Sequence, residues 1–398
     1  MALRKAGAAA AVLAVVLLPA PAPAKAAVAC DLTTQTAKIS TAQPYEDQLY
    51  DLARLAPLAD GSGVRVAVVD SGVDATHPQL KGRVVAGRDF LKDSDGRQDC
   101  VGHGTGVASI IAATEAGNAL FHGLAPGATI VPIRVSEREQ IDGKAVGEPG
   151  SATDFADAID YAADPDGGDA QVINLSLVMT EDDAGVREAV ARAIERGVVV
   201  VAAVGNLGGP NDTNQTPYPA DYPGVIGVGA IDANGLRADF SQHGDYVDVM
   251  AAGSKVTMAR LPTGQTVGDG TSFAAPFVAA TAALIKQRFP TLTPAQVTRR
   301  IVATADPAPL GRRSDEYGFG LLNPYRALTE TLGPDVAAPP APVAMRAADP
   351  AAVALQARRA RAQRRAVLVA GVGVGVVALL GILAAVVRRG RQRGWRPA

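Results

Sequence analysis

Five short runs rich in β-branched residues alternate with helical patterns along the middle of the chain. The runs are Gly63–Asp70, Thr129–Val135, Gln171–Leu177, Val198–Val204 and Val225–Val228. The helical patterns between them include Asp154–Ala163 and Asp183–Arg196. Strands that alternate with helices in this way form a parallel sheet with helices packed on both faces. The sequence therefore predicts an α/β fold with a doubly wound, mainly parallel sheet.

Three polar residues stand at positions where they could form a functional site on such a sheet. Asp70 ends the first run, at the carboxyl edge where open α/β sheets build their sites. His103 stands between two glycines and opens an apolar helical pattern, so that other groups can approach its ring closely. Asn206 follows a buried run on a glycine turn, although asparagine after glycine is also a common turn pair. All three are candidate site residues.

A fourth candidate, Ser272, lies in Gly270–Pro276, a stretch of small residues that leads into an apolar helical pattern. A serine just inside a helix start lies among unpaired N–H groups and at the positive end of the helix dipole. Both would stabilise a developing oxyanion. The same stretch also fits an ordinary capped helix. Ser272 is favoured as a nucleophile only because the chain also carries the other three candidate residues.

The four candidates together supply a complete set of groups for peptide hydrolysis. A serine nucleophile needs a base for its proton, an acid that orients the base, and donors for the oxyanion. Asp70, His103, Ser272 and Asn206 provide one group for each task. The competing acids and bases lack a place at the end of a buried strand or between glycines at a helix start; they are Asp74, Asp89, His77, His122 and His243.

Four motifs in this part of the chain resemble the signature motifs of the subtilisin-like serine proteases. They are Val69–Asp74, Gly102–Thr105, Ala203–Asn206 and Gly270–Pro276, and their order of Asp, His and Ser is also that of the family. The resemblance covers about residues 61–328. It implies that Asp70 orients His103, that His103 acts as general base and then general acid, and that Ser272 forms the acyl-enzyme. Asn206 and the Ser272 amide would bind the oxyanion.

The resemblance also implies which residues contact a protein or peptide substrate. On the strand that pairs with substrate the family usually has glycine after Ser-Leu, and this chain has Ser176, Leu177 and Val178. A valine side chain there would narrow the cleft. The polar segment Ser136–Thr153 is predicted to be a long loop that overhangs the cleft, touches a partner or is simply solvated. No cofactor is expected, and no metal, because no run of carboxylates has the spacing of a recognisable calcium loop.

Both ends of the chain carry membrane-related signals. Arg4 and Lys5 precede an apolar stretch and then a segment rich in proline and small residues, so residues 1–26 read as a signal peptide. Residues 366–387 are continuously apolar or glycine and long enough to span a bilayer, although a buried core helix is the alternative. We therefore predict a single-pass cell-membrane protein whose peptidase domain, residues 61–332, is extracytoplasmic. Residues 333–365 would form a Pro/Ala-rich linker with a basic stretch, and residues 388–398 a cytoplasmic tail.

The segment between the signal peptide and the peptidase domain, residues 27–60, is predicted to be an N-terminal extension. It holds Cys30, and the only other cysteine is Cys100. Outside the cytoplasm a disulfide is the expected use of this pair, worth about 4 kcal/mol for a loop of about 70 residues; lipidation of Cys30 is the alternative. Subtilases commonly carry a longer, cleavable prodomain. We therefore expect this short extension to wrap the body and stay attached.

Composition and architecture narrow the class of function. The net charge is −2 and basic residues gather at the C-terminus, so no nucleic-acid partner is expected. The succession of signal peptide, cysteine-bearing extension, subtilase body, linker and membrane helix resembles the mycosins, membrane-anchored proteases of type VII secretion systems. The resemblance implies processing of secreted proteins and association with the secretion membrane complex. A structural component of that complex, with little protease activity, is the alternative.

Overall fold

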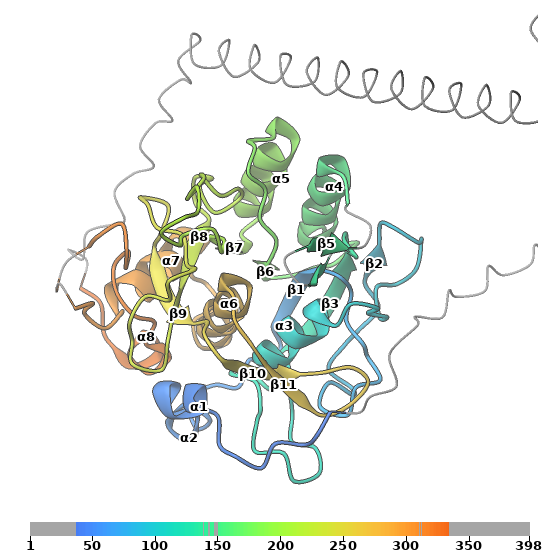
Figure 1. The fold of residues 1–398 in the computed structure, drawn as a ribbon, viewed down its shortest axis with the longest axis horizontal. Coiled ribbons are helices and arrows are strands. Elements are labelled where there is room, and N and C mark those ends of the chain that lie inside the picture. Colours follow the sequence, from blue (N-terminus) through green and yellow to red (C-terminus); the bar gives the residue numbers. More distant parts are fainter. Residues whose placement is uncertain are drawn as a thin grey trace, which may run out of the picture.

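A single seven-stranded sheet organises the protein, in the strand order β2-β3-β1-β6-β7-β8-β9 (Figure 1). The computed structural model describes residues 37–333, apart from 138, 142, 143, 147–149, 310 and 312. The strands are β1 Arg65–Asp70, β2 Arg88–Asp89, β3 Thr129–Arg134, β6 Val172–Leu175, β7 Val199–Ala203, β8 Ile226–Ile231 and β9 Val249–Ala252. Neighbouring strands of the sheet run parallel. The predicted α/β fold class is confirmed.

Helices cover both faces of this sheet (Figure 1). Successive side chains of a strand point to opposite faces, and β1 shows the result. Its Val66 and Val68 join one core with α3 (His103–Ala112) and α6 (Thr271–Arg288). Its Ala67 and Val69 join the other core with α4 (Ala152–Ala163) and α5 (Ala184–Glu195). The first of these cores is the one beneath the candidate site.

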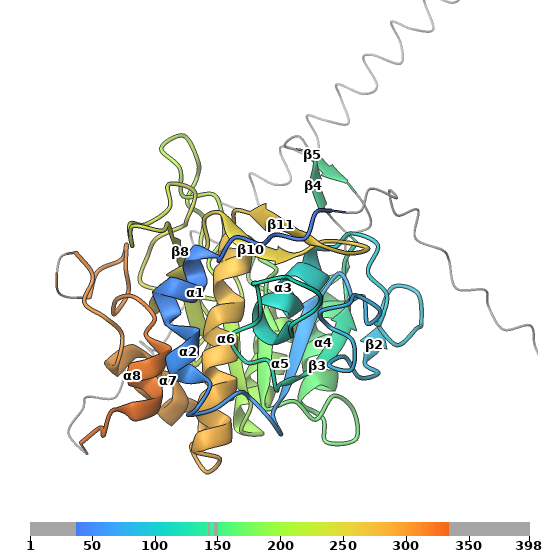
Figure 2. The same ribbon diagram turned by 90° about the horizontal axis from the view of Figure 1, so that it is seen from below.

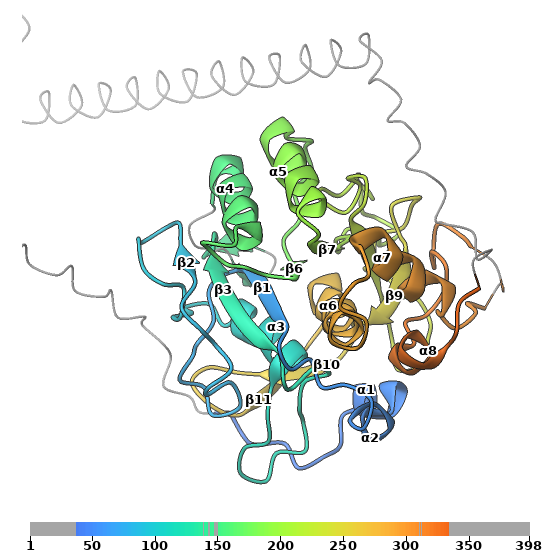
Figure 3. The ribbon, with the colours of Figure 1, turned by 180° about the vertical axis from the view of Figure 1, so that it is seen from behind.

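Helix α6 is central to that core. Seen from behind, it lies between α3 and α7 (Pro294–Ala303), and it also contacts α8 (Pro324–Thr329) (Figure 3). The start of α7 follows its sequence signals: Thr293 caps the helix by accepting a hydrogen bond from Gln296 N, and Pro294 is the first helical residue. These contacts leave α6 buried along most of its length.

The described part of the N-terminal extension packs on the body (Figure 2). Its helices are α1 (Tyr45–Tyr50) and α2 (Leu52–Leu55). The Tyr50 ring lies 5.0 Å from the Phe277 ring of α6, and its hydroxyl accepts a hydrogen bond from Ala252 N at 2.8 Å. Glu46 Oε1 accepts a bond from Thr257 N at 2.7 Å. Aromatic packing and buried hydrogen bonds therefore hold this segment against the core.

Two antiparallel hairpins stand outside the main sheet: β4 (Glu139–Ile141) with β5 (Lys144–Val146), and β10 (Val256–Ala259) with β11 (Gln265–Gly268). The first lies inside the segment 136–153 that was predicted as loop, so that prediction was incomplete. A hairpin forms its pairs locally, which a polar composition does not exclude.

The predicted signal peptide (1–26), the membrane span (366–387) and the tail (388–398) lie outside the described residues. Nearly all of the predicted linker, residues 333–365, lies outside them as well. Within the part of the chain that the structure describes, no helix has the length and apolarity needed to cross a bilayer.

Candidate active site

Asp70 and His103 meet where strand β1 ends and helix α3 begins. The Asp70 carboxylate oxygen Oδ1 lies 2.7 Å from Nδ1 of His103. Asp70 is 1% exposed, whereas the His103 side chain is 26% exposed. A buried carboxylate on Nδ1 fixes the ring orientation and directs Nε2 away from Asp70. This is the geometry of a base held by an acid.

A second buried carboxylate, Asp99, organises the backbone around this pair. Its Oδ1 accepts hydrogen bonds from Ser71 Oγ at 2.9 Å and Gly102 N at 2.8 Å, and its Oδ2 accepts from Thr105 N and Oγ1. Burial raises the pKa of Asp99, and the bonds from Gly102 and Thr105 act in the opposite direction. Ser71 Oγ in turn accepts from Gly104 N at 2.9 Å. Sequence reasoning missed Asp99; an acid just before a helix start was the available signal.

Gly104 allows α3 to begin directly against the end of β1. A Cβ on this residue would stand 2.2 Å from the Gly72 carbonyl oxygen and 3.1 Å from Asp70 Cβ. Because real side chains do not approach so closely, only glycine fits. Of the two glycines beside His103, Gly104 thus allows a close approach, to the end of β1, whereas an added Cβ on Gly102 would make only ordinary contact with Leu261.

Ser272 is the second residue of α6, and the start of this helix lies beside His103. The ring of Phe273 is 5.2 Å from the His103 ring and tilted by 42°. A Cβ on Gly270 would stand 2.9 Å from Ser272 Oγ and 3.4 Å from Asn206 Nδ2. The hydroxyl and the amide therefore flank the same glycine, next to the histidine.

The Asn206 amide has a defined orientation. Its Oδ1 accepts hydrogen bonds from both the backbone N and the Oγ1 of Thr271, each at 2.9 Å. Thr271 Oγ1 also accepts from Gly205 N at 3.0 Å. With the oxygen held by Thr271, the Nδ2 donor points to the other side, where Ser272 lies. The residue itself is exposed, which leaves that donor accessible.

The predicted substrate strand follows β6 and is tied to α6. Ser176 Oγ donates a hydrogen bond to the Ser272 carbonyl oxygen at 2.7 Å. Leu177 packs against one core and Val178 against the other. Met179 exchanges two backbone hydrogen bonds with Tyr218. The structure thus places Ser176 at the start of α6, and substrate binding by this strand stays a prediction.

Three of the residues that could have taken the place of Asp70 or His103 make contacts outside the candidate site. Asp89 is buried and pairs with Arg134, the last residue of β3, at 3.3 Å. Asp74 accepts hydrogen bonds from Thr76. Burial lowers the pKa of His77, whose Nδ1 accepts from Gln79 N. These contacts are those of structural residues.

Cys100 lies near this region, with its Sγ 3.7 Å from Arg134 Nη2. It is not a free cysteine. Cys30, its predicted partner, lies outside the described residues. The Cys30–Cys100 disulfide therefore stays a prediction.

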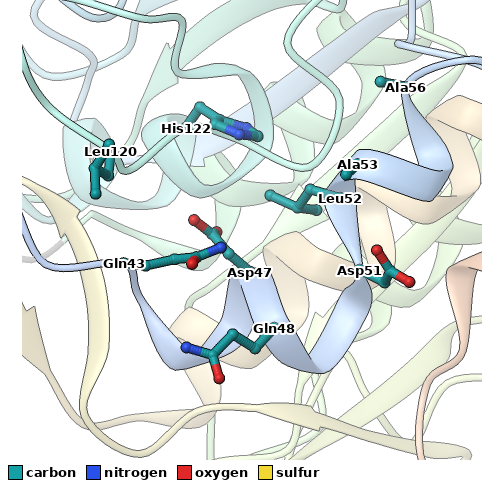
Figure 4. A pocket seen from close by; sticks show the side chains of 9 residues that line it. All are labelled: Gln43, Asp47, Gln48, Asp51, Leu52, Ala53, Ala56, Leu120 and His122. Atoms are coloured by element: carbon teal, nitrogen blue, oxygen red, sulfur yellow. The ribbon is translucent and has the colours of Figure 1, made fainter.

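A pocket of about 550 Å³ lies between the N-terminal extension and the segment around His122 (Figure 4). Its lining is Gln43, Asp47, Gln48, Asp51, Leu52, Ala53, Ala56, Leu120 and His122. This set contains no candidate catalytic residue. His122, one of the alternative bases, therefore belongs to a different part of the surface.

The model of the subtilase family matches residues 61–320. The chain belongs to the subtilase family. By family, this subtilase is a subtilisin-like serine endopeptidase. It is 38% identical to Subtilisin DY of Bacillus licheniformis over 265 residues, which cover 66% of this chain and 90% of that protein. The match to a thermophilic serine proteinase of a Bacillus species, 37% identical, covers 72% of this chain and 65% of that protein.

Similarity to mycosins extends further along the chain. Mycosin-4 of Mycobacterium tuberculosis is 35% identical over a gapped alignment 404 residues long, which covers 91% of this subtilase and 86% of that protein. The crystal structure of MycP1 with its N-terminal propeptide removed gives a TM-score of 0.61 at 31% identity, covering 74% of this chain and 99% of that one. MycP3, a protease from the type VII (ESX-3) secretion system, gives 0.60 at 30% identity, covering 73% and 89%. The resemblance to mycosins is confirmed.

Proposed function

We propose that this subtilase is a membrane-anchored, extracytoplasmic serine endopeptidase that processes secreted proteins of a type VII secretion system. The observation that carries the proposal is the 2.7 Å contact between Asp70 and His103 with the start of α6 beside the imidazole ring. A buried acid, an oriented base and a serine at a helix start form the arrangement that acyl transfer requires. The secretion role is supported by the similarity to Mycosin-4 and MycP3.

In the proposed mechanism His103 removes the proton from Ser272 Oγ as that oxygen attacks the scissile carbonyl carbon. Asp70 holds the imidazole and stabilises its protonated form. Asn206 Nδ2 and the Ser272 N–H donate to the oxyanion of the tetrahedral intermediate. His103 then protonates the leaving amine, and a water molecule, activated by the same base, hydrolyses the acyl-enzyme. Ser176, Leu177 and Val178 would line the substrate, with Val178 narrowing the cleft.

The anchoring part of the proposal is supported by the sequence. A cleaved signal peptide at residues 1–26 would place the peptidase domain, residues 61–332, outside the cytoplasm. The apolar run 366–387 would span the membrane, after the linker 333–365 and before the short tail 388–398. The extension 27–60 would remain bound to the body.

Labelling with a fluorophosphonate tests the catalytic proposal. The full-length chain is purified in detergent beside its Ser272→Ala variant, and both are treated with the probe. Labelling of the wild type alone is expected, because the probe reacts with an activated serine. Equal labelling of both, or of neither while both are folded, would remove Ser272 from its proposed role.

A structural role in the secretion complex is the second candidate. One structural neighbour, MycP1, is described as an essential component of the type VII (ESX-1) secretion system. In cells, secretion is compared between Ser272→Ala and complete deletion. Equal defects favour catalysis as the essential function, and a defect only on deletion favours the structural role.

A further inference from the structure

Helix α6 contains a proline four residues after Ser272. In an α-helix the N–H of a residue donates to the carbonyl four residues earlier. Pro276 has no N–H, and its ring crowds the carbonyl of Ser272. The helix therefore cannot supply the usual hydrogen bond to the Ser272 carbonyl, although this residue lies in the first turn of a buried helix.

The missing donor comes from the end of strand β6. Ser176 Oγ lies 2.7 Å from the Ser272 carbonyl oxygen, and Asn174 Nδ2 lies 2.9 Å from Ser176 Oγ. Ser176 is 5% exposed and Asn174 is fully buried. An amide nitrogen can only donate, and a hydroxyl has a single hydrogen. The direction of the chain is therefore fixed: Asn174 donates to Ser176, and Ser176 donates to Ser272.

We propose that Ser176 is a positioning residue for the nucleophile. Its hydroxyl replaces the helix hydrogen bond that Pro276 removes, and so fixes the peptide group that follows Ser272. This role differs from the substrate contact predicted from sequence. It rests on the proposed function, because it takes Ser272 to be the nucleophile. Without the hydroxyl, a buried carbonyl would lack a partner and the turn that carries Ser272 would shift to find one. Small displacements of a reacting group reduce rates strongly.

The test uses the full-length chain and a fluorophosphonate, whose reaction with Ser272 gives a maximal rate, kinact, and a binding constant, KI. Ser176→Ala is expected to lower kinact about ten-fold and to leave KI unchanged. Ser176→Thr keeps the hydroxyl and is expected to stay near the wild-type rate. The decisive variant is Ser176→Ala combined with Pro276→Ala. The alanine introduced at position 276 has an N–H that can donate to the Ser272 carbonyl, so most of kinact should return.

A matched control lies in the same helix. Thr281 Oγ1 donates to the Phe277 carbonyl at 2.8 Å and is buried. The backbone N–H of Thr281 is in the position to donate to that same carbonyl. Thr281→Val therefore removes a buried hydroxyl of the same kind without leaving a carbonyl unsatisfied. Its kinact should equal that of the wild type.

Two results would overturn the inference. One is an unchanged kinact in Ser176→Ala. The other is a loss that the second substitution, Pro276→Ala, does not recover, because the hydroxyl would then act by another route. A wild-type chain that is folded but does not label is a different result, since it contradicts the proposed function itself. Thermal unfolding of each variant separates a loss of positioning from a loss of the fold.

Discussion

Asn206 is held by Thr271 so that its amide hydrogens face Ser272. Removing one preorganised oxyanion donor costs about 10²–10³ in rate in enzymes of this chemistry. Asn206→Ala is therefore expected to slow fluorophosphonate labelling by about that factor. The melting temperature should also fall, because the buried Thr271 loses the acceptor of its N–H and Oγ1 hydrogen bonds, so labelling is compared at temperatures where both proteins are folded.

The companion substitution tests how the amide is oriented. Thr271→Val loses the Oγ1 bond to Asn206 Oδ1 but keeps the backbone N–H bond. Its labelling rate should fall less than that of Asn206→Ala, and Thr271→Ser should restore it. A wild-type rate in Asn206→Ala would show that the backbone alone stabilises the oxyanion.

A second prediction at the scale of single residues concerns Gly104. Its missing side chain lets α3 start against Gly72, and a Cβ would overlap the carbonyl oxygen of that residue. Gly104→Ala is expected to lower the free energy of unfolding by about 2 kcal/mol or more and to displace His103. Denaturant unfolding and the labelling rate measure the two effects.

The control for Gly104 is another glycine at the second position of a helix. Gly185 lies there in α5, where the nearest atom to an added Cβ is the side-chain oxygen Asp183 Oδ1 at 3.2 Å. Gly185→Ala should cost much less than Gly104→Ala, because its one close neighbour is a side-chain oxygen at 3.2 Å and not a backbone oxygen at 2.2 Å, and alanine favours helix. Equal losses in the two variants would mean that helix position, and not the contact with Gly72, decides the cost.

The candidate residues stand in recognisable motifs of the sequence, whereas the residues that hold them in place do not. Asp70, His103, Asn206 and Ser272 stand in short motifs because each chemical task needs a particular residue beside a tight turn. Asp99 has no such motif: its partners Val101, Gly102 and Thr105 are near it in sequence, whereas Ser71, which links it to the end of β1, is 28 residues away. The acid before the helix start was a local signal, but its bond to Ser71 is a tertiary contact, which a single sequence does not display.

At the scale of elements, the docking of helix α1 depends on two buried acids. Glu46 is 1% exposed and Asp47 is 7% exposed. Burial raises the pKa of each to about 7. Between the ordinary carboxyl pKa and about 7 the folded protein then holds more protons than the unfolded chain. Since stability falls with pH where the folded state binds more protons, these groups weaken the docking of α1 as the pH rises toward 7.

The double substitution Glu46→Gln with Asp47→Asn isolates this effect. Both new amides are uncharged at every pH, and the oxygen of the glutamine introduced at position 46 can still accept from Thr257 N. The difference in free energy of unfolding between variant and wild type should be small at pH 4, where the wild-type carboxyls are protonated in the folded state and partly protonated in the unfolded chain. At pH 8 it should be the more stable of the two. Denaturant unfolding across this range measures the difference, and a constant difference would mean that the two acids do not titrate on unfolding.

The strands that the sequence predicted are rich in β-branched residues, and the strands that it missed are not. Strands β1, β3, β6 and β7 are buried on both faces, so each reads as a continuous run of β-branched residues. Strand β9 reads Val-Met-Ala-Ala, and β11 is half exposed, so neither shows such a run. The place where α1 and α2 pack on the body could not be predicted from the sequence either, because it depends on distant partners such as Ala252 and Thr257.

At the scale of the molecule, the predicted anchor can be tested by fractionation. If residues 366–387 span the membrane, the full-length protein should stay with membranes after alkaline carbonate washing, whereas a chain ending at residue 333 should be released. Release of the full-length chain by carbonate would contradict the anchor. Equal labelling of both forms by fluorophosphonate would show that the anchor serves location and not catalysis.

The last prediction concerns how the extension stays attached. Contacts of Tyr50 and Glu46 hold the helices of residues 45–55 against the body, and we therefore expect the extension to stay attached. A Cys30–Cys100 bridge would add a covalent tie and stabilise the chain by up to about 4 kcal/mol in the chain-entropy model. Intact mass of active protein should show an N-terminus before Cys30 and a bridge that reduction opens, with a fall in melting temperature. Cys30→Ser should melt like the reduced wild type. An active protein that begins beyond Asp60 would show that the extension is dispensable and that the body alone is the enzyme.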